Sequence, residues 1–173
     1  RLNSFLEHKN DNFYHSIDTF NPIIAEEAFQ NNFSVVNDVS GVQDQRMITT
    51  LRKHSAGLIL THRNNYSSSI HEKSDYKDIV RDVKNDLMKQ VENILESGVN
   101  RDQIAIDVGL GFGKTQEQSA TLFESIGQFV GDYPLVVGYS RKKFTQLLKT
   151  SDEELLNHCQ NHGVSLVRLH FID

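Results

Sequence analysis

The feature that most constrains the fold is a repeated alternation of short apolar runs with longer amphipathic segments. Runs of this length that are apolar almost throughout are typical of strands buried on both faces, as in a parallel sheet covered by helices. The sequence therefore predicts a β-α repeat with strands at 13–18, 33–38, 56–62, 103–109, 134–140 and 164–171.

The segments between these runs carry helix start and stop signals. Asn21 and Pro22 suit the cap and the first position of a helix. Thr115 with Gln118, and Ser151 with Glu154, have the spacing of a capping box. The segment 76–95 has the clearest helical pattern, with apolar residues spaced by three and four, and Gly98 is expected to end it. We expect helices at 22–30, 45–53, 76–95, from Thr115 to Val130, and from Ser151 to near Gly163.

Two architectures are compatible with this repeat: a doubly wound open sheet and a (β/α)₈ barrel. No low-complexity linker divides the 173 residues. A chain of this length is by default one domain, so we expect a single domain over 1–173.

Polar and charged residues follow each of the predicted strands. The carboxyl ends of parallel strands meet on one rim, and in a barrel that rim collects the catalytic residues. Six strands that all end this way favour an enzyme or a binding protein over a purely structural one. The residues are Asp18, Asn37, Asp38, Thr61, His62, Asp107, Ser140, Arg141, Lys142, Arg168 and His170.

The stretch "IDVGLGFGKT" (106–115) resembles a phosphate-binding loop but fails both standard templates. The Walker A spacing needs a glycine at 108, where the chain has Val108, and the dinucleotide fingerprint needs one at 114, where it has Lys114. We interpret the stretch as a strand end that presents Asp107. Its glycines then leave space for a ligand, and Lys114 and Thr115 mainly start the next helix.

The rim combines carboxylates and a carboxamide with cationic side chains. Asp18, Asn37 and Asp107 suit the N–H donors of a polar heterocycle, whereas cations such as Arg168 suit an anion. Simpler interpretations stay open for some positions, because Asp18 and Asn37 also fit turns and Lys142 also fits a solvated helix start. Arg168 is the least ordinary of the group, since a guanidinium in an apolar run needs an anionic partner.

Composition excludes several classes of protein. A net charge of −5 and a pI near 5.9 argue against a general nucleic-acid binder. Cys159, the single cysteine, excludes an intrachain disulfide and is compatible with the cytoplasm. No apolar run approaches the ~20 residues of a membrane span. The histidines lack zinc-site spacing, so we expect no protein-held metal.

Six strings together resemble one family. "SIDTF", "VVNDVSG", "LTH", "IDVGLGFGKT", "VVGYSRKKF" and "LVRLH", in this order, are similar to the dihydropteroate synthases, which are pterin-binding (β/α)₈ barrels. The resemblance implies a transferase of folate biosynthesis. This enzyme joins 6-hydroxymethyl-7,8-dihydropterin diphosphate to p-aminobenzoate and releases diphosphate. It also implies a cytoplasmic homodimer that uses Mg²⁺ with the diphosphate.

The resemblance also assigns roles to residues. It implies that the pterin ring is held by Asp18, Asn37, Asp107 and Lys142, and that diphosphate is bound by Arg168 and His170. Phe112 and the segment from Ser140 to Lys143 would line the p-aminobenzoate side. By the same resemblance, Lys142, Arg168 and His170 would take part directly in catalysis.

The motifs of the family's first two strands are absent from the sequence. We therefore expect about six βα units here, with the first two units of an eight-unit barrel missing. Two alternatives to the synthase follow from this departure and from the shared fold. One is a non-catalytic paralogue that binds pterin or supports a partner, and the other is a pterin-binding domain of the methyltransferase type.

Overall fold

One sheet of six parallel strands forms the centre of the molecule. The computed structural model describes residues 2–10, 12–63 and 76–170. Within these residues the strands follow the sequence in spatial order, from β1 at one edge of the sheet to β6 at the other. They are β1 (Ser16–Asp18), β2 (Val35–Asp38), β3 (Gly57–Thr61), β4 (Ile104–Asp107), β5 (Leu135–Gly138) and β6 (Leu166–Arg168).

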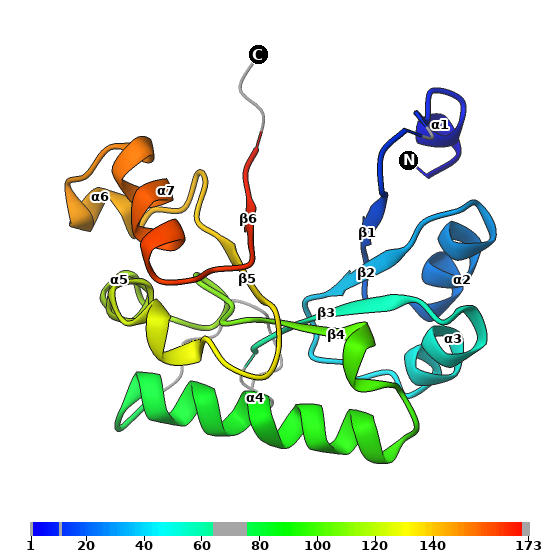
Figure 1. Ribbon diagram of the computed structural model, residues 1–173, viewed down its shortest axis with the longest axis horizontal. Helices are drawn as coiled ribbons and strands as arrows, with labels where there is room; N and C mark the ends of the chain where they lie inside the picture. The colour runs from blue at the N-terminus through cyan, green and yellow to red at the C-terminus, as the bar shows by residue number, and fades with distance from the viewer. Residues whose placement is uncertain (1, 11, 64–75, 171–173) are drawn as a thin grey trace.

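The strand order decides between the two predicted architectures. A doubly wound sheet reverses its strand order at a switch point, whereas a barrel adds each strand beside the preceding one. The six strands here never reverse, and the sheet curls so that β1 and β6 face each other across a hollow (Figure 1). The molecule is therefore an open, barrel-type α/β sheet.

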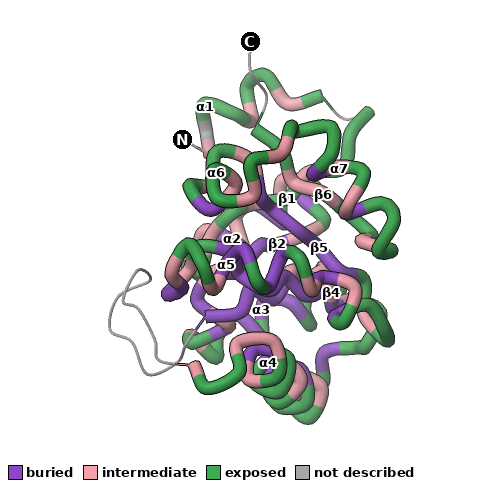
Figure 2. The backbone as a smooth tube through the Cα atoms, turned by 90° about the vertical axis from the view of Figure 1, so that its left-hand side faces the viewer, coloured by how far each residue is buried: buried purple, intermediate pink, exposed green. Residues whose placement is uncertain are grey.

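Helices cover the outer, convex side of the sheet (Figure 1). Figure 2 shows buried residues concentrated in the strands, while much of the helical surface is exposed. The helices are α1 (Leu2–Leu6), α2 (Pro22–Gln30), α3 (Arg46–His54), α4 (Ile79–Glu96), α5 (Gln116–Glu124), α6 (Thr145–Leu148) and α7 (Asp152–Asn161), with 3₁₀ turns η1 (Arg101–Gln103) and η2 (Ile126–Phe129).

The predicted capping residues begin their helices. The Asn21 side chain accepts a hydrogen bond from the Ile23 amide at 2.9 Å, and full capping boxes form at Thr115 and Ser151. Helix α4 begins later than predicted, at Ile79, because Asp78 caps it by accepting from the Arg81 amide. These contacts satisfy amide donors that the first helical turn leaves without partners.

The helix predicted from Thr115 to Val130 is wrong in its second half. Helix α5 ends at Glu124, and a tighter 3₁₀ turn, η2, follows. Gly127 lies within that turn, and the His162 ring packs so closely that an added Cβ would lie 3.0 Å from it. The short helix α6 was not predicted. The Asn- and Ser-rich segment 64–69, whose composition predicts a polar loop, lies outside the described residues.

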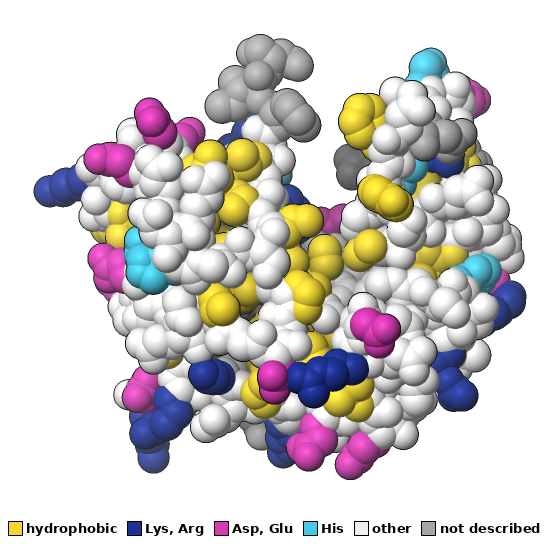
Figure 3. All heavy atoms as spheres, viewed as in Figure 1, with side chains coloured by type: hydrophobic (Ala, Val, Ile, Leu, Met, Phe, Trp, Pro, Cys, Tyr) yellow, Lys and Arg dark blue, Asp and Glu magenta, His cyan; other side chains and the backbone are white. Residues whose placement is uncertain are grey.

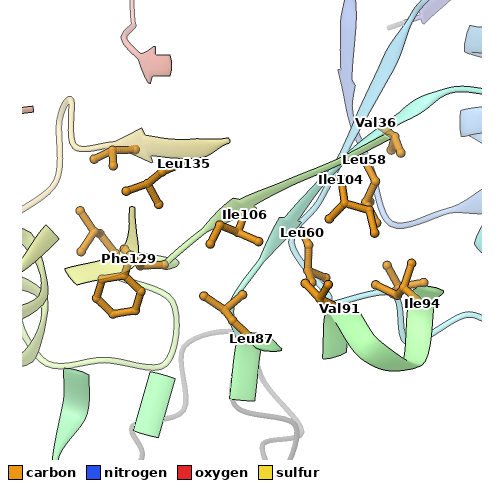
Figure 4. Close-up of a cluster of buried hydrophobic side chains, with 14 of the residues drawn as sticks. Val36, Leu58, Leu60, Leu87, Val91, Ile94, Ile104, Ile106, Phe129 and Leu135 are labelled. Atoms are coloured by element: carbon orange, nitrogen blue, oxygen red, sulfur yellow. The ribbon is translucent and has the colours of Figure 1, made fainter. Parts of the chain in front are cut away.

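The hydrophobic core lies between the outer face of the sheet and the helices. Successive residues of a strand point to opposite faces. Figure 4 shows the outward-pointing side chains of Leu60 and Ile106 meeting Leu87 and Val91 of α4. The prediction that all strands are buried on both faces is wrong for β1 and β6, where Leu166 is 52% exposed. Among the described residues, none of the helices combines the length and the apolar character that a membrane span requires.

Replacing Leu87 by alanine tests the contribution of this core. Leu87 is fully buried, so Leu87→Ala should lower the free energy of unfolding by about 2–5 kcal/mol through lost burial and the cavity that remains. Urea unfolding at 25 °C measures the change. The matched control is Lys89→Ala on the exposed side of α4, which should change stability by less than about 0.5 kcal/mol. Equal effects of both variants would contradict this packing.

Candidate functional site

The inner face of the sheet lines a hollow of about 610 Å³. Its floor is largely apolar and includes Val35, Ile59 and Val136, and Figure 3 shows hydrophobic side chains along the hollow between the two limbs of the molecule. Asp18, Asn37 and Arg168 add polar groups to the same wall. Small-molecule sites commonly combine an apolar lining with a few placed polar groups in this way.

Asn37 and Asp107 each present a buried polar atom that has no hydrogen-bond partner among the described residues. Asn37 is 3% exposed; its Oδ1 accepts from Thr61 Oγ1 at 3.0 Å, while Nδ2 is unpaired. Asp107 is 1% exposed; its Oδ1 accepts from the Gly109 amide at 2.8 Å, while Oδ2 is unpaired. Burying such groups unpaired is costly, so a ligand that pairs with them would be stabilised.

Asp18 and Arg168 form an ion pair between the two edge strands. Arg168 Nη1 lies 3.2 Å from Asp18 Oδ2, and both side chains are partly exposed. The guanidinium lies against the backbone of Gly138, where an added Cβ would be 3.2 Å from Nε. The sequence predicted an anionic partner for Arg168, and Asp18 is that partner here. Only one N–H of five is donated to Asp18, so donors are left for a second anion.

Lys142 lines a second pocket, of about 530 Å³, at the rim. Its Nζ donates to the Leu110 carbonyl at 2.5 Å and lies 5.1 Å from the centre of the Phe112 ring. Burial lowers the pKa of the Lys142 ammonium, and the charge of Asp107 opposes that effect. Phe112 and Lys142 line the rim pocket together with Arg141 and Lys143.

The remaining predicted site residues are Ser140, His170 and Asp38. Ser140 follows β5 and is partly buried, but it does not line the rim pocket. His170 lies two residues beyond β6 and is exposed. Asp38 points to the outer face, away from Asn37, and accepts from the amide and hydroxyl of Ser40 at 2.7 and 2.6 Å. Burial raises the pKa of Asp38.

The glycines of "GLGFG" allow the backbone conformation of the loop itself. Gly109, Gly111 and Gly113 have positive φ angles of 67°, 79° and 62°, which other residues rarely adopt. Gly109 also makes the closest approach, because an added Cβ would lie 2.1 Å from the His62 carbonyl oxygen. The loop after β4 is thereby packed onto the end of β3.

Sequence reasoning missed the role of Lys114. Thr115 caps α5 as predicted, but Lys114 turns back into the loop and donates to the carbonyls of Gly109 and Phe112, both at 3.0 Å. Burial lowers the pKa of its ammonium to about 7, opposed by the charge of Asp107. A lysine directly after alternating glycines was the available signal, but its direction is a tertiary property.

His62 is a fully buried imidazole next to this lysine. Its Nδ1 lies 3.0 Å from Lys114 Nζ, and its Nε2 lies 3.5 Å from Asp86 Oδ2. Burial, followed by the charge of Lys114, lowers the pKa of His62 to about 4. The imidazole is therefore neutral near pH 7.

The described residues contain no group of three His, Cys, Asp or Glu side chains able to hold a metal ion. The carboxylate nearest the proposed anion side, Asp18, already pairs with Arg168. The residues that the structure describes therefore do not fit a Mg²⁺ ion held by protein ligands alone.

Comparison with known proteins identifies relatives. The family description "Pterin binding enzyme" matches residues 1–170. Curated dihydropteroate synthases from Bacillus subtilis and a Synechocystis species are 30% and 34% identical over 131 residues. These matches cover 75% of this chain but 44% and 45% of the relatives. The chain thus spans less than half the length of the curated relatives it matches.

Solved structures show the same arrangement. A dihydropteroate synthase from Thermus thermophilus in complex with 6HMPPP has a TM-score of 0.81 and 29% identity. That match covers 92% of this chain and 67% of the other. A dihydropteroate synthase from Stenotrophomonas maltophilia, at 22% identity and a TM-score of 0.83, supports the fold alone; there the match covers 96% of this chain and 66% of the other.

Alanine substitutions in the glycine loop should lower the free energy of unfolding by different amounts. Gly109→Ala combines a positive φ with a clash against the His62 carbonyl, whereas Gly111→Ala has a positive φ but no atom closer than 3.8 Å. We expect Gly111→Ala to cost about 1–2 kcal/mol of stability, and Gly109→Ala clearly more. Denaturant unfolding measures both. The prediction fails if the two costs are the same.

The buried imidazole predicts a pH-dependent stability. The folded-state pKa of His62, about 4, lies below its unfolded value near 6.5. The unfolded state thus binds more protons between these values, and stability falls as pH drops from about 6.5 to 4. Relative to His62→Asn, wild type should lose up to about 3 kcal/mol over this window. Urea unfolding at several pH values tests this, and a pH-independent difference would contradict it.

Proposed function

We propose, because this chain belongs to the family of pterin-binding enzymes, that the protein acts as a dihydropteroate synthase in folate biosynthesis. The reaction would join a dihydropterin diphosphate to p-aminobenzoate. Relatives with this name match three quarters of the chain, and structures of dihydropteroate synthases align with most of it.

The observation that carries the proposal is the pair of unpaired buried atoms, Asn37 Nδ2 and Asp107 Oδ2. A pterin edge carries an amino group and ring N–H donors beside ring nitrogen and carbonyl acceptors. Its donors match the carboxylate of Asp107, and its acceptors match the carboxamide N–H of Asn37. The apolar floor of the hollow suits the flat ring.

The anionic part of the substrate would lie at the edge strands. Arg168 and His170 would bind the diphosphate, with Asp18 holding the guanidinium in place and facing the pterin side. In the reaction, the amine nitrogen forms a bond to the exocyclic methylene carbon. The carbon–oxygen bond breaks, diphosphate leaves with the electron pair, and the amine loses a proton. Cations at the leaving group stabilise its developing charge.

The second substrate would bind at the rim pocket. Phe112 offers a ring face to p-aminobenzoate, and the cationic residues 141–143, which line the same pocket, suit its carboxylate. Lys142 lines the rim pocket, and we propose that it contacts both substrates and holds the amine in line with the methylene carbon.

The described residues offer no set of ligands for the expected Mg²⁺. Oxygens of the diphosphate would suit this hard cation. We assign it no step of the reaction.

We further propose the complete (β/α)₈ architecture, with two more strands between β6 and β1, as the active form. Among the described residues, β1 and β6 each pair with one neighbouring strand only, and Leu166 in β6 and Leu169 just after it are exposed; both observations support the proposal. A single domain, a homodimer and a cytoplasmic location stay predictions.

Asp107→Asn tests the pterin site. Losing a charged hydrogen bond should weaken binding of 6-hydroxymethyl-7,8-dihydropterin diphosphate by about 1–3 kcal/mol, or roughly five- to 150-fold in Kd. Isothermal titration calorimetry measures it. The matched control is Asp38→Asn, an equally buried aspartate on the opposite face, which should leave Kd unchanged. An unchanged Kd for Asp107→Asn would remove that residue from the site.

The catalytic claim needs a separate measurement. Folded protein supplied with pterin diphosphate, p-aminobenzoate and Mg²⁺ should form 7,8-dihydropteroate, detected by chromatography. Binding of pterin diphosphate without product would instead favour the non-catalytic paralogue. Binding of methyltetrahydrofolate but not p-aminobenzoate would favour the methyltransferase type.

A further inference from the structure

The loop after β4 is organised around a cation of the protein itself. Lys114 is 7% exposed, and its Nζ meets three acceptors at 3.0 Å: Gly109 O, Phe112 O and His62 Nδ1. The His62 carbonyl lies further away, at 3.4 Å. An ammonium has three N–H donors, and three near acceptors satisfy them. The loop thus turns carbonyl oxygens inward, the reverse of a phosphate-binding loop, which turns amides toward an anion.

The contact with His62 fixes the state of its imidazole. Because an ammonium can only donate, Nδ1 must accept, and the ring proton must lie on Nε2, facing Asp86. His62 follows β3 and Lys114 follows β4, so their contact joins two neighbouring strand ends 52 residues apart in sequence. The charged groups around Lys114 are Asp107, Lys142 and Asp86.

Lys114 and Lys142 bind different carbonyls of the same loop. The carbonyls of Gly109 and Phe112, at the two ends of the turn, point to Lys114, whereas the Leu110 carbonyl between them receives Lys142 Nζ. The Phe112 amide closes the turn on Gly109 O at 3.0 Å. The position of Lys142, and of the Phe112 ring beneath its ammonium, therefore depends on a backbone that Lys114 holds.

From these contacts we infer that Lys114, supported by His62, is a positioning residue of the pterin site. Its ammonium holds the loop 109–113 in the one conformation in which Leu110 and Phe112 receive Lys142. Lys114 acts through Lys142 and not on the substrate, because its N–H groups are directed at protein acceptors. The consequence for turnover rests on the proposed function, whereas the structural role does not.

The first test needs no ligand. In wild-type protein with ¹⁵N-labelled histidine, the His62 signals are assigned by their loss in His62→Asn. NMR at pH 6 lies between the pKa of about 4 for His62 and about 7 for Lys114. Nε2 should be protonated and Nδ1 unprotonated. A charged ring, or a proton on Nδ1, would overturn the inference.

The second test compares Lys114→Met with Lys89→Met, a lysine exposed on α4. Ring signals of Phe112 should shift in Lys114→Met and stay in place in Lys89→Met. If Lys114→Met does not fold, Lys114→Gln, which keeps N–H donors on a shorter neutral side chain, takes its place. Unmoved Phe112 signals in a folded Lys114 variant would overturn the role.

The third test separates positioning from general stability. Lys114→Met and Lys142→Met should each lower kcat/KM for p-aminobenzoate by about tenfold or more. In the Lys142→Met background, adding Lys114→Met should cost less than about twofold, because both act through one contact. Additive losses would overturn the inference. If wild type neither binds pterin diphosphate nor turns over, the proposed function fails, while the two NMR tests still decide the role of Lys114.

Discussion

The site depends on one electrostatic arrangement, the enclosure of the Lys114 ammonium by the loop that follows β4. A buried cation is costly unless acceptors surround it, and the loop supplies them by turning Gly109 O and Phe112 O inward. The positive φ angles at the three glycines make this backbone path possible. His62 adds an acceptor from the neighbouring strand end, so the loop and the β3 end are held together.

The alternation of side chains along each strand separates stability from function. Outward residues such as Leu60 and Ile106 pack against α4 and form the core (Figure 4). Inward residues such as Asn37 and Asp107 are outside that packing and present buried polar atoms on the inner side, although the outward Asp38 also has an unpaired oxygen, Oδ2. The adjacent residues Asn37 and Asp38 illustrate the division, since one faces the hollow and the other is bound to Ser40 on the outer side.

Much of the fold could be predicted because the signals are local. The caps at Asn21, Thr115 and Ser151 depend on residues two or three positions away, and the strands end in polar groups where expected. The turn η2 that follows α5 was not predicted, and its contact between Gly127 and the His162 ring of a distant segment is not visible in the local sequence. Arg168 was expected to need an anion, but its pairing with Asp18 depends on how far the sheet curls.

The sequence by itself determined the β-α repeat, the polar rim and the set of chemical groups on it, because periodicity and strand polarity are properties of neighbouring residues. Only the tertiary structure decided the unreversed strand order and the direction of each polar side chain. It also decided that Lys114 faces the loop and not the solvent. Those features depend on contacts between residues far apart in the chain, such as His62 with Lys114 and Asp18 with Arg168, which form only when the sheet has curled and brought them together.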